Sequence, residues 1–358
     1  MQKFNIKIRH IRSLVSPNIR NLRAYNAKEI PCRVKLDANE SPYGFEINDK
    51  ILKSIKTNRY PDPEAKTLKK IISKNLRLNP KNILFGNGSD ELIYYLITVF
   101  GGPVLYPVPT FSMYGIISQA LGEKRIEVPL DDEFDLDTDR ILSLIKKEKP
   151  GIIFLSSPNN PTGNCFSADR ILKIVEFTSS LVTSHLSLVV IDEAYQPFSS
   201  EKGFLPMLSD YKNLVILRTM SKIGFAGLRV GFLIADSEII NEVNKVRLPF
   251  NLNSFSQAVA ATLIKNTNTI KLHIGLITSE RERLLNELWK IKGIKPYPSE
   301  ANFILFKVKN SDKIYYRLLK KSVLVRNMKG VVNGCLRVTV GTKKENNIFI
   351  KALKEVMK

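Results

Sequence analysis

The 358-residue sequence has little histidine, little cysteine and no long hydrophobic run. The three histidines (His10, His185 and His273) lie outside every motif described below, so neither a Ser-His nor a zinc mechanism is indicated. The three cysteines are widely spaced, which gives no disulfide framework and favours a reducing compartment. No stretch reaches the roughly 18 apolar residues that a membrane span requires.

Acidic residues are also scarce, with 34 Asp and Glu against 55 Lys and Arg and a net charge of +21. Such a balance raises nucleic acid as a partner. However, the lysines are distributed along the chain with only short clusters, such as residues 146–149. We therefore expect no specific nucleic-acid partner, and we expect small anionic substrates to be attracted. The basic arm before Glu29 resembles a transit peptide, but a cytoplasmic location is favoured.

Lys222 follows a short apolar segment, 213–217, that is typical of a buried strand. In open α/β sheets, ligands bind beyond the carboxyl ends of the strands. Ser221 and Arg229 flank this lysine, and a hydroxyl with a guanidinium can bind a phosphate group. Most lysines are solvated surface cations, but one in this setting can bind a cofactor aldehyde covalently.

A second apolar segment, 186–191, is typical of a central parallel strand and ends at Asp192. A carboxylate buried there needs a cation, such as a protonated pyridine nitrogen; a helix cap or a salt bridge is the alternative. Tyr195 could direct its hydroxyl at the oxygen of the same ring. Asn160 lies in a turn after the strand-like segment 151–155, and it is either a turn former or a donor to that oxygen.

Residues 86–89 form a glycine-containing turn between a strand-like segment and a helical pattern that starts at Asp90. The free backbone N–H groups at such a helix start form an anion site. Asp90 and Glu91 are interpreted as capping this helix.

Taken in order, these motifs resemble those of the fold-type I pyridoxal-phosphate aminotransferases and, within that group, the histidinol-phosphate aminotransferases. The likeness extends from about Asn18 to about Thr342. Besides the segments around Asn160, Asp192 and Lys222, the matching segments are 18–25, 36–44, 59–62, 86–91, 109–114 and 334–341. The resemblance implies an α/β fold, in which helices flank a mainly parallel sheet in a large domain and a smaller α+β domain follows.

The resemblance also implies pyridoxal 5′-phosphate as the cofactor. It gives catalytic roles to Lys222, Asp192 and Tyr195 and a cofactor site of Ser89, Asp90, Phe111, Asn160, Asp192, Tyr195, Ser221, Lys222, Arg229 and Tyr60. Phe111 would stack on the ring, where many relatives have tyrosine; taken alone, it could be an ordinary core side chain. Tyr60 would cross a homodimer interface to the other subunit's phosphate, although by itself it would be a surface tyrosine in a loop.

For the substrate, the resemblance implies Tyr25, Asn39, Arg326 and Arg337. In aminotransferases generally, the arginine at position 337 holds the substrate carboxylate, whereas in the histidinol-phosphate enzymes it holds the substrate phosphate. Arg326 matches a second phosphate ligand. A guanidinium binds two oxygens of either anion at once, and either arginine alone would more often be a solvated surface charge. No metal site is implied.

We predict three parts: an N-terminal arm (1–33), a large cofactor-binding domain (34–246) and a small C-terminal domain (247–358). The favoured activity is transamination between histidinol phosphate and 2-oxoglutarate, a step of histidine biosynthesis. An aromatic or broad-specificity aminotransferase and a lyase of the threonine-phosphate decarboxylase type remain alternatives. A protein that only binds a cofactor or nucleic acid is disfavoured by the intact Lys222 and Asp192 motifs.

Overall fold

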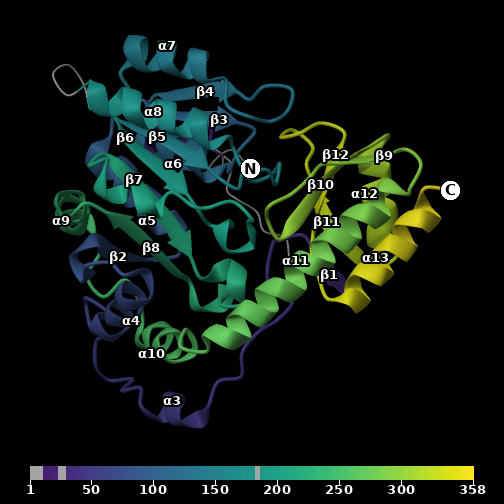
Figure 1. Ribbon diagram of the computed structural model, residues 1–358, viewed down its shortest axis with the longest axis horizontal. Coiled ribbons are helices and arrows are strands. Elements are labelled where there is room, and N and C mark those ends of the chain that lie inside the picture. Colours follow the sequence, from purple (N-terminus) through teal and green to yellow (C-terminus); the bar gives the residue numbers. More distant parts are fainter. Residues whose placement is uncertain (1–10, 23–29, 182–185) are drawn as a thin grey trace.

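A computed structural model describes residues 11–22, 30–181 and 186–358 (Figure 1). Its larger sheet has the strand order β2 (Ile83–Asn87), β8 (Val230–Ala235), β7 (Leu214–Thr219), β6 (Leu188–Asp192), β5 (Ile152–Ser156), β3 (Val104–Val108) and β4 (Arg125–Pro129). β8 runs antiparallel to both of its neighbours, and the other strand pairs are parallel. The predicted mainly parallel sheet is therefore confirmed.

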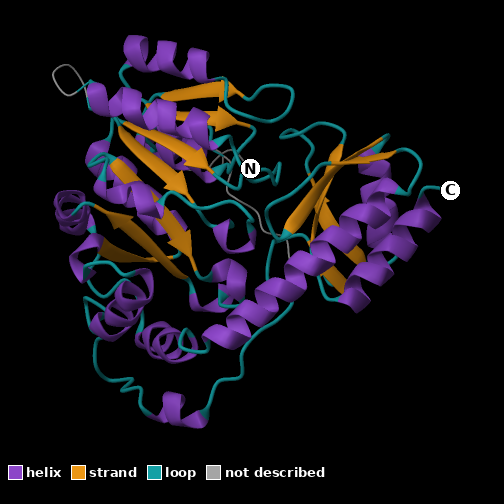
Figure 2. Ribbon diagram, in the orientation of Figure 1, coloured by secondary structure: helices purple, strands orange, loops and turns teal. Residues whose placement is uncertain are grey.

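Helices cover both faces of this sheet (Figure 2). One face packs against α4 (Lys66–Leu76), α7 (Thr138–Glu148), α8 (Ala168–Ser180) and α10 (Ser254–Leu263). The other face packs against α5 (Ser89–Phe100), α6 (Met113–Leu121) and α9 (Ser237–Val246). Because the central strands are buried on both sides, β5 and β6 consist almost entirely of apolar residues and show no alternation.

A second sheet has the order β1 (Val34–Leu36), β11 (Val323–Asn327), β12 (Cys335–Thr339), β10 (Phe303–Val308) and β9 (Ile294–Pro296). Its core is shared with α11 (Thr267–Trp289), α12 (Ser311–Lys320) and α13 (Lys343–Val356). The short helices α2 (Pro17–Arg20) and α3 (Asp49–Lys53) lie in the N-terminal region. The chain thus has the predicted α+β C-terminal part.

The predicted domain ranges remain a prediction, and three elements near residues 33 and 246 bear on them. β1 pairs in parallel with β11, so residues 34–36 belong to the smaller sheet although they come early in the chain. α10 follows residue 246 and packs in the core of the larger sheet. α11 begins at Thr267 and contributes to both cores: Ile270 to the first, and Leu284 and Leu288 to the second.

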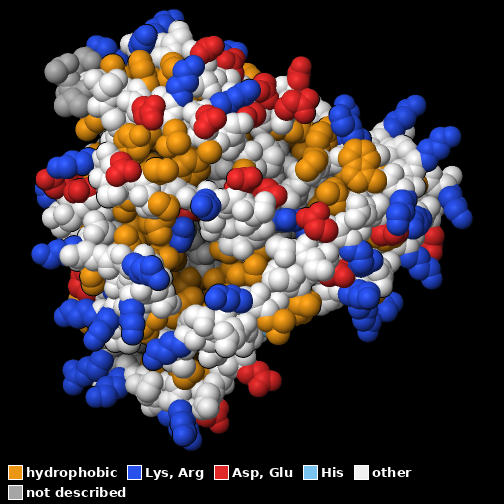
Figure 3. Space-filling model, in the orientation of Figure 1, with side chains coloured by type: hydrophobic (Ala, Val, Ile, Leu, Met, Phe, Trp, Pro, Cys, Tyr) orange, Lys and Arg blue, Asp and Glu red, His pale blue; other side chains and the backbone are white. Residues whose placement is uncertain are grey.

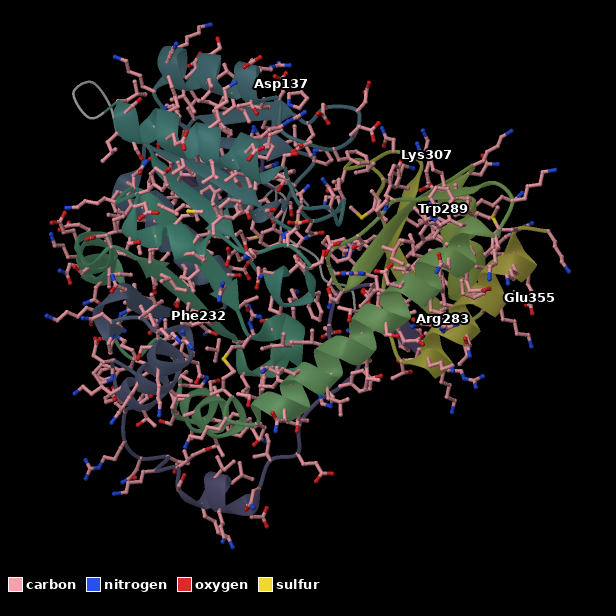
Figure 4. The ribbon with its side chains drawn as sticks, in the orientation of Figure 1. Asp137, Phe232, Arg283, Trp289, Lys307 and Glu355 are labelled. Atoms are coloured by element: carbon pink, nitrogen blue, oxygen red, sulfur yellow. The ribbon has the colours of Figure 1, made fainter. Side chains whose placement is uncertain are left out.

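The surface reflects the excess of basic residues. Lys and Arg side chains project around the margin of the smaller domain (Figure 3). Trp289 and Lys307 lie on that side, whereas Phe232 lies in the larger domain (Figure 4). Within the described residues, no helix combines the length and the apolar character that crossing a membrane requires.

Candidate active site

The carboxyl ends of β5, β6 and β7 open into one cavity of about 100 Å³. Its lining consists of Ser89, Asp90, Phe111, Ser156, Asn160, Asp192, Ala194, Tyr195, Thr219, Ser221, Lys222 and Arg229. The structure therefore brings together nine of the ten predicted cofactor residues; Tyr60 is the exception. Parallel neighbouring strands place the ends of distant segments at one edge of the sheet, and this geometry forms the cavity.

Asp192 is the last residue of β6 and is 3% exposed. Its Oδ1 accepts a hydrogen bond from the Ala194 N–H at 3.0 Å, and its Oδ2 accepts one from the Tyr114 hydroxyl at 2.7 Å. Burial raises the pKa of Asp192 to about 6, against the opposing effect of these two hydrogen bonds. The carboxylate is thus held in place, and a nearby cation would stabilise its ionised form.

Lys222 lies in the short helix η4 (Ser221–Ile223), directly after β7. Its Nζ is 5.6 Å from the centroid of the Tyr195 ring, on the cavity wall. Gly224 ends the helix with φ of 103°, and a Cβ there would come within 2.8 Å of the Tyr43 carbonyl oxygen. Glycine is therefore required at this position if Lys222 is to keep its place beside the cavity.

The start of α5 forms a narrow cradle between Gly88 and Arg229. The Gly88 N–H donates to the Arg229 carbonyl oxygen at 2.8 Å, and a Cβ at Gly88 would come within 2.3 Å of Arg229 Nη2. Arg229 Nη2 lies 3.3 Å from Asp90 Oδ2. Helix N–H groups, the Ser89 hydroxyl and a guanidinium are a donor set suited to a phosphate. The ion pair explains how an acidic residue is accommodated beside an anion site.

Tyr195 is held by a polar network that reaches the smaller sheet. Asn39 Nδ2 donates to the Tyr195 hydroxyl oxygen at 2.9 Å. Asn39 is buried with φ of 56°, and its backbone N–H donates to the Thr339 hydroxyl. Because Asn39 occupies an acceptor site on the tyrosine oxygen, the hydroxyl proton of Tyr195 remains able to donate to a ligand. The structure therefore places Asn39, a predicted substrate residue, directly behind Tyr195.

Arg337 on β12 lies next to Asn160. Arg337 Nη1 donates to Asn160 Oδ1 at 2.5 Å, and Nη2 donates to the Asp37 carbonyl oxygen at 2.8 Å. The guanidinium also lies 5.1 Å from the centroid of the Phe303 ring. Since Arg337 uses the oxygen of the Asn160 amide, the NH₂ group of Asn160 is left to donate into the cavity.

Arg326 on β11 is the direct cross-strand partner of Arg337. Directly opposed residues of an antiparallel pair have side chains on the same face of the sheet. Arg326 is partly exposed and Arg337 is buried. The two predicted substrate arginines therefore lie on one face, and Arg337 lies on the cavity side through its contact with Asn160.

Asn39, Arg326, Arg337 and Tyr60 are not among the residues that line this cavity. Tyr60 is 82% exposed and its ring stacks on Phe250 with centroids 4.6 Å apart. Tyr25 lies outside the described residues. Within those residues, no group of three His, Cys, Asp or Glu side chains could hold a metal ion.

Sequence reasoning missed the contact of Tyr114 with Asp192. The segment 109–114 drew attention to Phe111, but nothing marked the tyrosine three residues later as part of the site. Phe111 lies just before α6, and the N–H of Tyr114, the second residue of that helix, donates to the Phe111 carbonyl oxygen at 3.3 Å. Only the fold brings this helix beneath the end of β6.

A buried acid and a lysine at adjacent strand ends, beside a helix-start anion site, define a cofactor-dependent group-transfer enzyme of the α/β class. The chain belongs to the family described as aminotransferase class I and II, which it matches over residues 21–353.

Individual relatives agree with this assignment. The chain is 44% identical to the histidinol-phosphate aminotransferase of Aquifex aeolicus (strain VF5), with 96% of this chain and 98% of the relative covered. It is similar to the crystal structure of the histidinol-phosphate aminotransferase from Clostridium acetobutylicum, with TM-score 0.82, 28% identity and coverage of 90% and 98%. The enzyme from Sinorhizobium meliloti, solved in complex with pyridoxal-5′-phosphate, gives TM-score 0.82, 25% identity and coverage of 96% and 98%.

The residues around the cavity fit pyridoxal phosphate as the cofactor. The lining contains the groups that such a cofactor requires: the amine of Lys222, the buried carboxylate of Asp192, and hydrogen-bond donors on Tyr195 and Asn160. Phe111 offers a flat face on the cavity wall, and Ser89, Ser221 and Arg229 surround the anion cradle. The cavity thus has a complementary group for the aldehyde, the ring nitrogen, the ring oxygen and the phosphate of such a cofactor.

The pKa of Asp192 predicts how cofactor affinity depends on pH. Below about pH 6 the buried carboxyl is protonated and cannot pair with a protonated ring nitrogen. We therefore expect the dissociation constant of pyridoxal 5′-phosphate, followed by quenching of protein fluorescence, to increase as pH falls through 6. Because the cofactor phosphate also titrates near there, Asp192→Asn is the control. That variant should bind more weakly at pH 8 and lose less affinity on acidification. Equal slopes for the two proteins would contradict this role of Asp192.

Proposed function

We propose that the chain catalyses transamination of L-histidinol phosphate with 2-oxoglutarate, giving imidazole-acetol phosphate and glutamate. The observation that carries the substrate choice is the cross-strand pair of Arg326 and Arg337 on one face of the smaller sheet. A phosphate dianion can accept charge-assisted hydrogen bonds from two guanidinium groups, whereas a monoanionic carboxylate needs only one. The names of the relatives support the same substrate.

When bound, pyridoxal phosphate would supply the electron sink that transamination requires. Lys222 Nζ would hold the cofactor and, once freed by the amino donor, would act as the general base that takes the proton from the substrate Cα and as the acid that gives it back. Asp192 would keep the ring nitrogen protonated, and Tyr195 and Asn160 would donate to the ring oxygen. Arg229 and the start of α5 hold the phosphate.

We further infer a homodimer with shared sites. Tyr60 and Phe250 form an exposed aromatic pair outside the cavity of their own chain. A second subunit docked on this surface would receive the Tyr60 hydroxyl at its cofactor phosphate. The expected cytoplasmic location, with a small-molecule substrate and no specific nucleic-acid partner, belongs to the same proposal.

Lys222→Ala tests the catalytic assignment. The variant should bind pyridoxal phosphate without the visible absorbance of the lysine-bound cofactor, and turnover should fall by at least about a hundredfold because the general base is lost. Lys202→Ala, on an exposed loop, is the matched control and should retain both signals. Steady-state activity retained by Lys222→Ala would contradict the assignment.

Arg326→Ala tests the substrate. The change should lower kcat/KM for histidinol phosphate at least about tenfold, roughly 1.4 kcal/mol, because one charge-assisted bond to the phosphate is lost. Phenylalanine, which has no phosphate, should be affected less. Arg317→Ala, at an exposed position of α12, is the control for charge alone.

The alternative activities give different outcomes in the same assays. If the wild type prefers phenylalanine and Arg326→Ala leaves that preference unchanged, the aromatic aminotransferase alternative replaces the proposal. Release of CO₂ from threonine phosphate would favour the lyase alternative. Histidinol phosphate, phenylalanine and threonine phosphate are therefore assayed in parallel with the wild type and with Arg326→Ala.

Hybrid dimers test the crossing of Tyr60. Tyr60→Phe subunits mixed with Lys222→Ala subunits give hybrids in which the single Lys222-bearing site takes its tyrosine from the partner. That site should therefore show wild-type cofactor affinity, measured by absorbance titration of the isolated hybrid. Affinity equal to that of pure Tyr60→Phe protein would place the tyrosine within its own chain.

A further inference from the structure

Tyr114 is fully buried at the start of α6, behind the cavity. Its ring stacks on Phe154 of β5, with centroids 4.6 Å apart and planes 8° apart, and it meets Phe111 edge-on at 5.7 Å. These contacts fix the ring, so the hydroxyl points at one place. That place is Asp192 Oδ2, at 2.7 Å.

We propose that Tyr114 is a positioning residue for Asp192, whose hydroxyl fixes one carboxylate oxygen and favours the ionised over the protonated form. The hydroxyl must donate, because an ionised carboxylate has no proton to give. A hydrogen bond to the charged form of an acid stabilises that form. Burial and the charge of Asp192 raise the pKa of Tyr114 well above its ordinary value, so the hydroxyl keeps its proton.

Other charged groups near Asp192 also shift its pKa. Asp90 at the start of α5 raises the pKa of Asp192, and Lys222 in η4 lowers it. Arg229 and Tyr195 complete the polar lining of the cavity. Tyr114→Phe leaves all of them in place and removes one oxygen atom. The inference rests on the proposed cofactor chemistry, because Asp192 matters here as the partner of the ring nitrogen.

The test compares Tyr114→Phe with Tyr106→Phe. Tyr106 is a matched control, because it is also buried and its hydroxyl donates to a carboxylate, Glu127 Oε1 at 2.9 Å, outside the cavity. The readout is the dissociation constant of pyridoxal 5′-phosphate between pH 5.5 and 8.5, with thermal unfolding of the cofactor-free protein as the check on folding.

For Tyr114→Phe we expect the pH at which affinity declines to move up by about one unit. Near pH 6.5 affinity should then be weaker by up to about tenfold and should approach the wild type at pH 8.5. Tyr106→Phe should follow the wild-type curve. In an Asp192→Asn background, Tyr114→Phe should add almost nothing, because its effect passes through the carboxylate. A Tyr114→Phe curve that superimposes on the wild type, or an equal loss in the Asp192→Asn background, would overturn the proposal.

If Tyr114→Phe does not fold, 3-fluorotyrosine at position 114 keeps the ring and its packing. Its hydroxyl is a stronger donor, so the decline in affinity should move to lower pH, and no movement would overturn the proposal. The experiment distinguishes failure of the proposed function from failure of the role of Tyr114. Wild-type protein that binds no pyridoxal phosphate overturns the proposed function and this inference together, whereas an unshifted Tyr114 variant overturns this inference alone.

Discussion

The site depends on a carboxylate buried at the end of a central strand. Asp192 lies between apolar strands where an isolated charge is unfavourable, and the neighbouring groups offset that cost. The Ala194 N–H and the Tyr114 hydroxyl each bind one of its oxygens. Neither is a cation, so the pKa of Asp192 stays raised and the carboxylate still favours a positively charged partner. A protonated pyridine nitrogen would meet that requirement. The buried carboxylate would therefore favour a cofactor that carries such a nitrogen.

The surrounding structure keeps the two neighbouring strand ends in register. Glu193, next to Asp192, is buried and forms an ion pair with Arg218 of β7, with Arg218 Nη2 2.7 Å from Glu193 Oε2. A second Glu193 oxygen accepts from the Phe204 N–H. The loop that carries Asp192 is thereby tied to the strand that leads to Lys222. Removing one partner of a buried ion pair leaves an uncompensated charge, so this pair makes independent movement of Asp192 and Lys222 costly.

Much of the larger sheet could be predicted because its strands are short, apolar and buried on both faces, and because ligand residues follow them directly. Lys222, Asp192 and Asn160 were found this way, since the end of a parallel strand is a position that the sequence reveals. β1 could not be found by the same reasoning. A three-residue strand with an alternating burial pattern does not indicate which sheet it joins. Its partner, β11, lies almost 290 residues later in the sequence. Tyr114 was not predicted for a similar reason. Its partner, Asp192, is distant in the sequence, and a tyrosine ring is common in core helices.

The short strand β1 positions the residues that follow it beside the candidate site. Directly after it come Asp37, whose carbonyl oxygen accepts from Arg337, and Asn39, which donates to Tyr195. One short segment thus contacts both a predicted substrate arginine and a predicted cofactor residue. Arg337 adds a second link through Asn160 on the larger sheet. A ligand that moved Arg337 would therefore disturb Asn160 directly, and it would disturb Tyr195 through residues 37–39. The cofactor half and the substrate half of the site are joined by hydrogen bonds across the two sheets, as a reaction that joins cofactor and substrate requires.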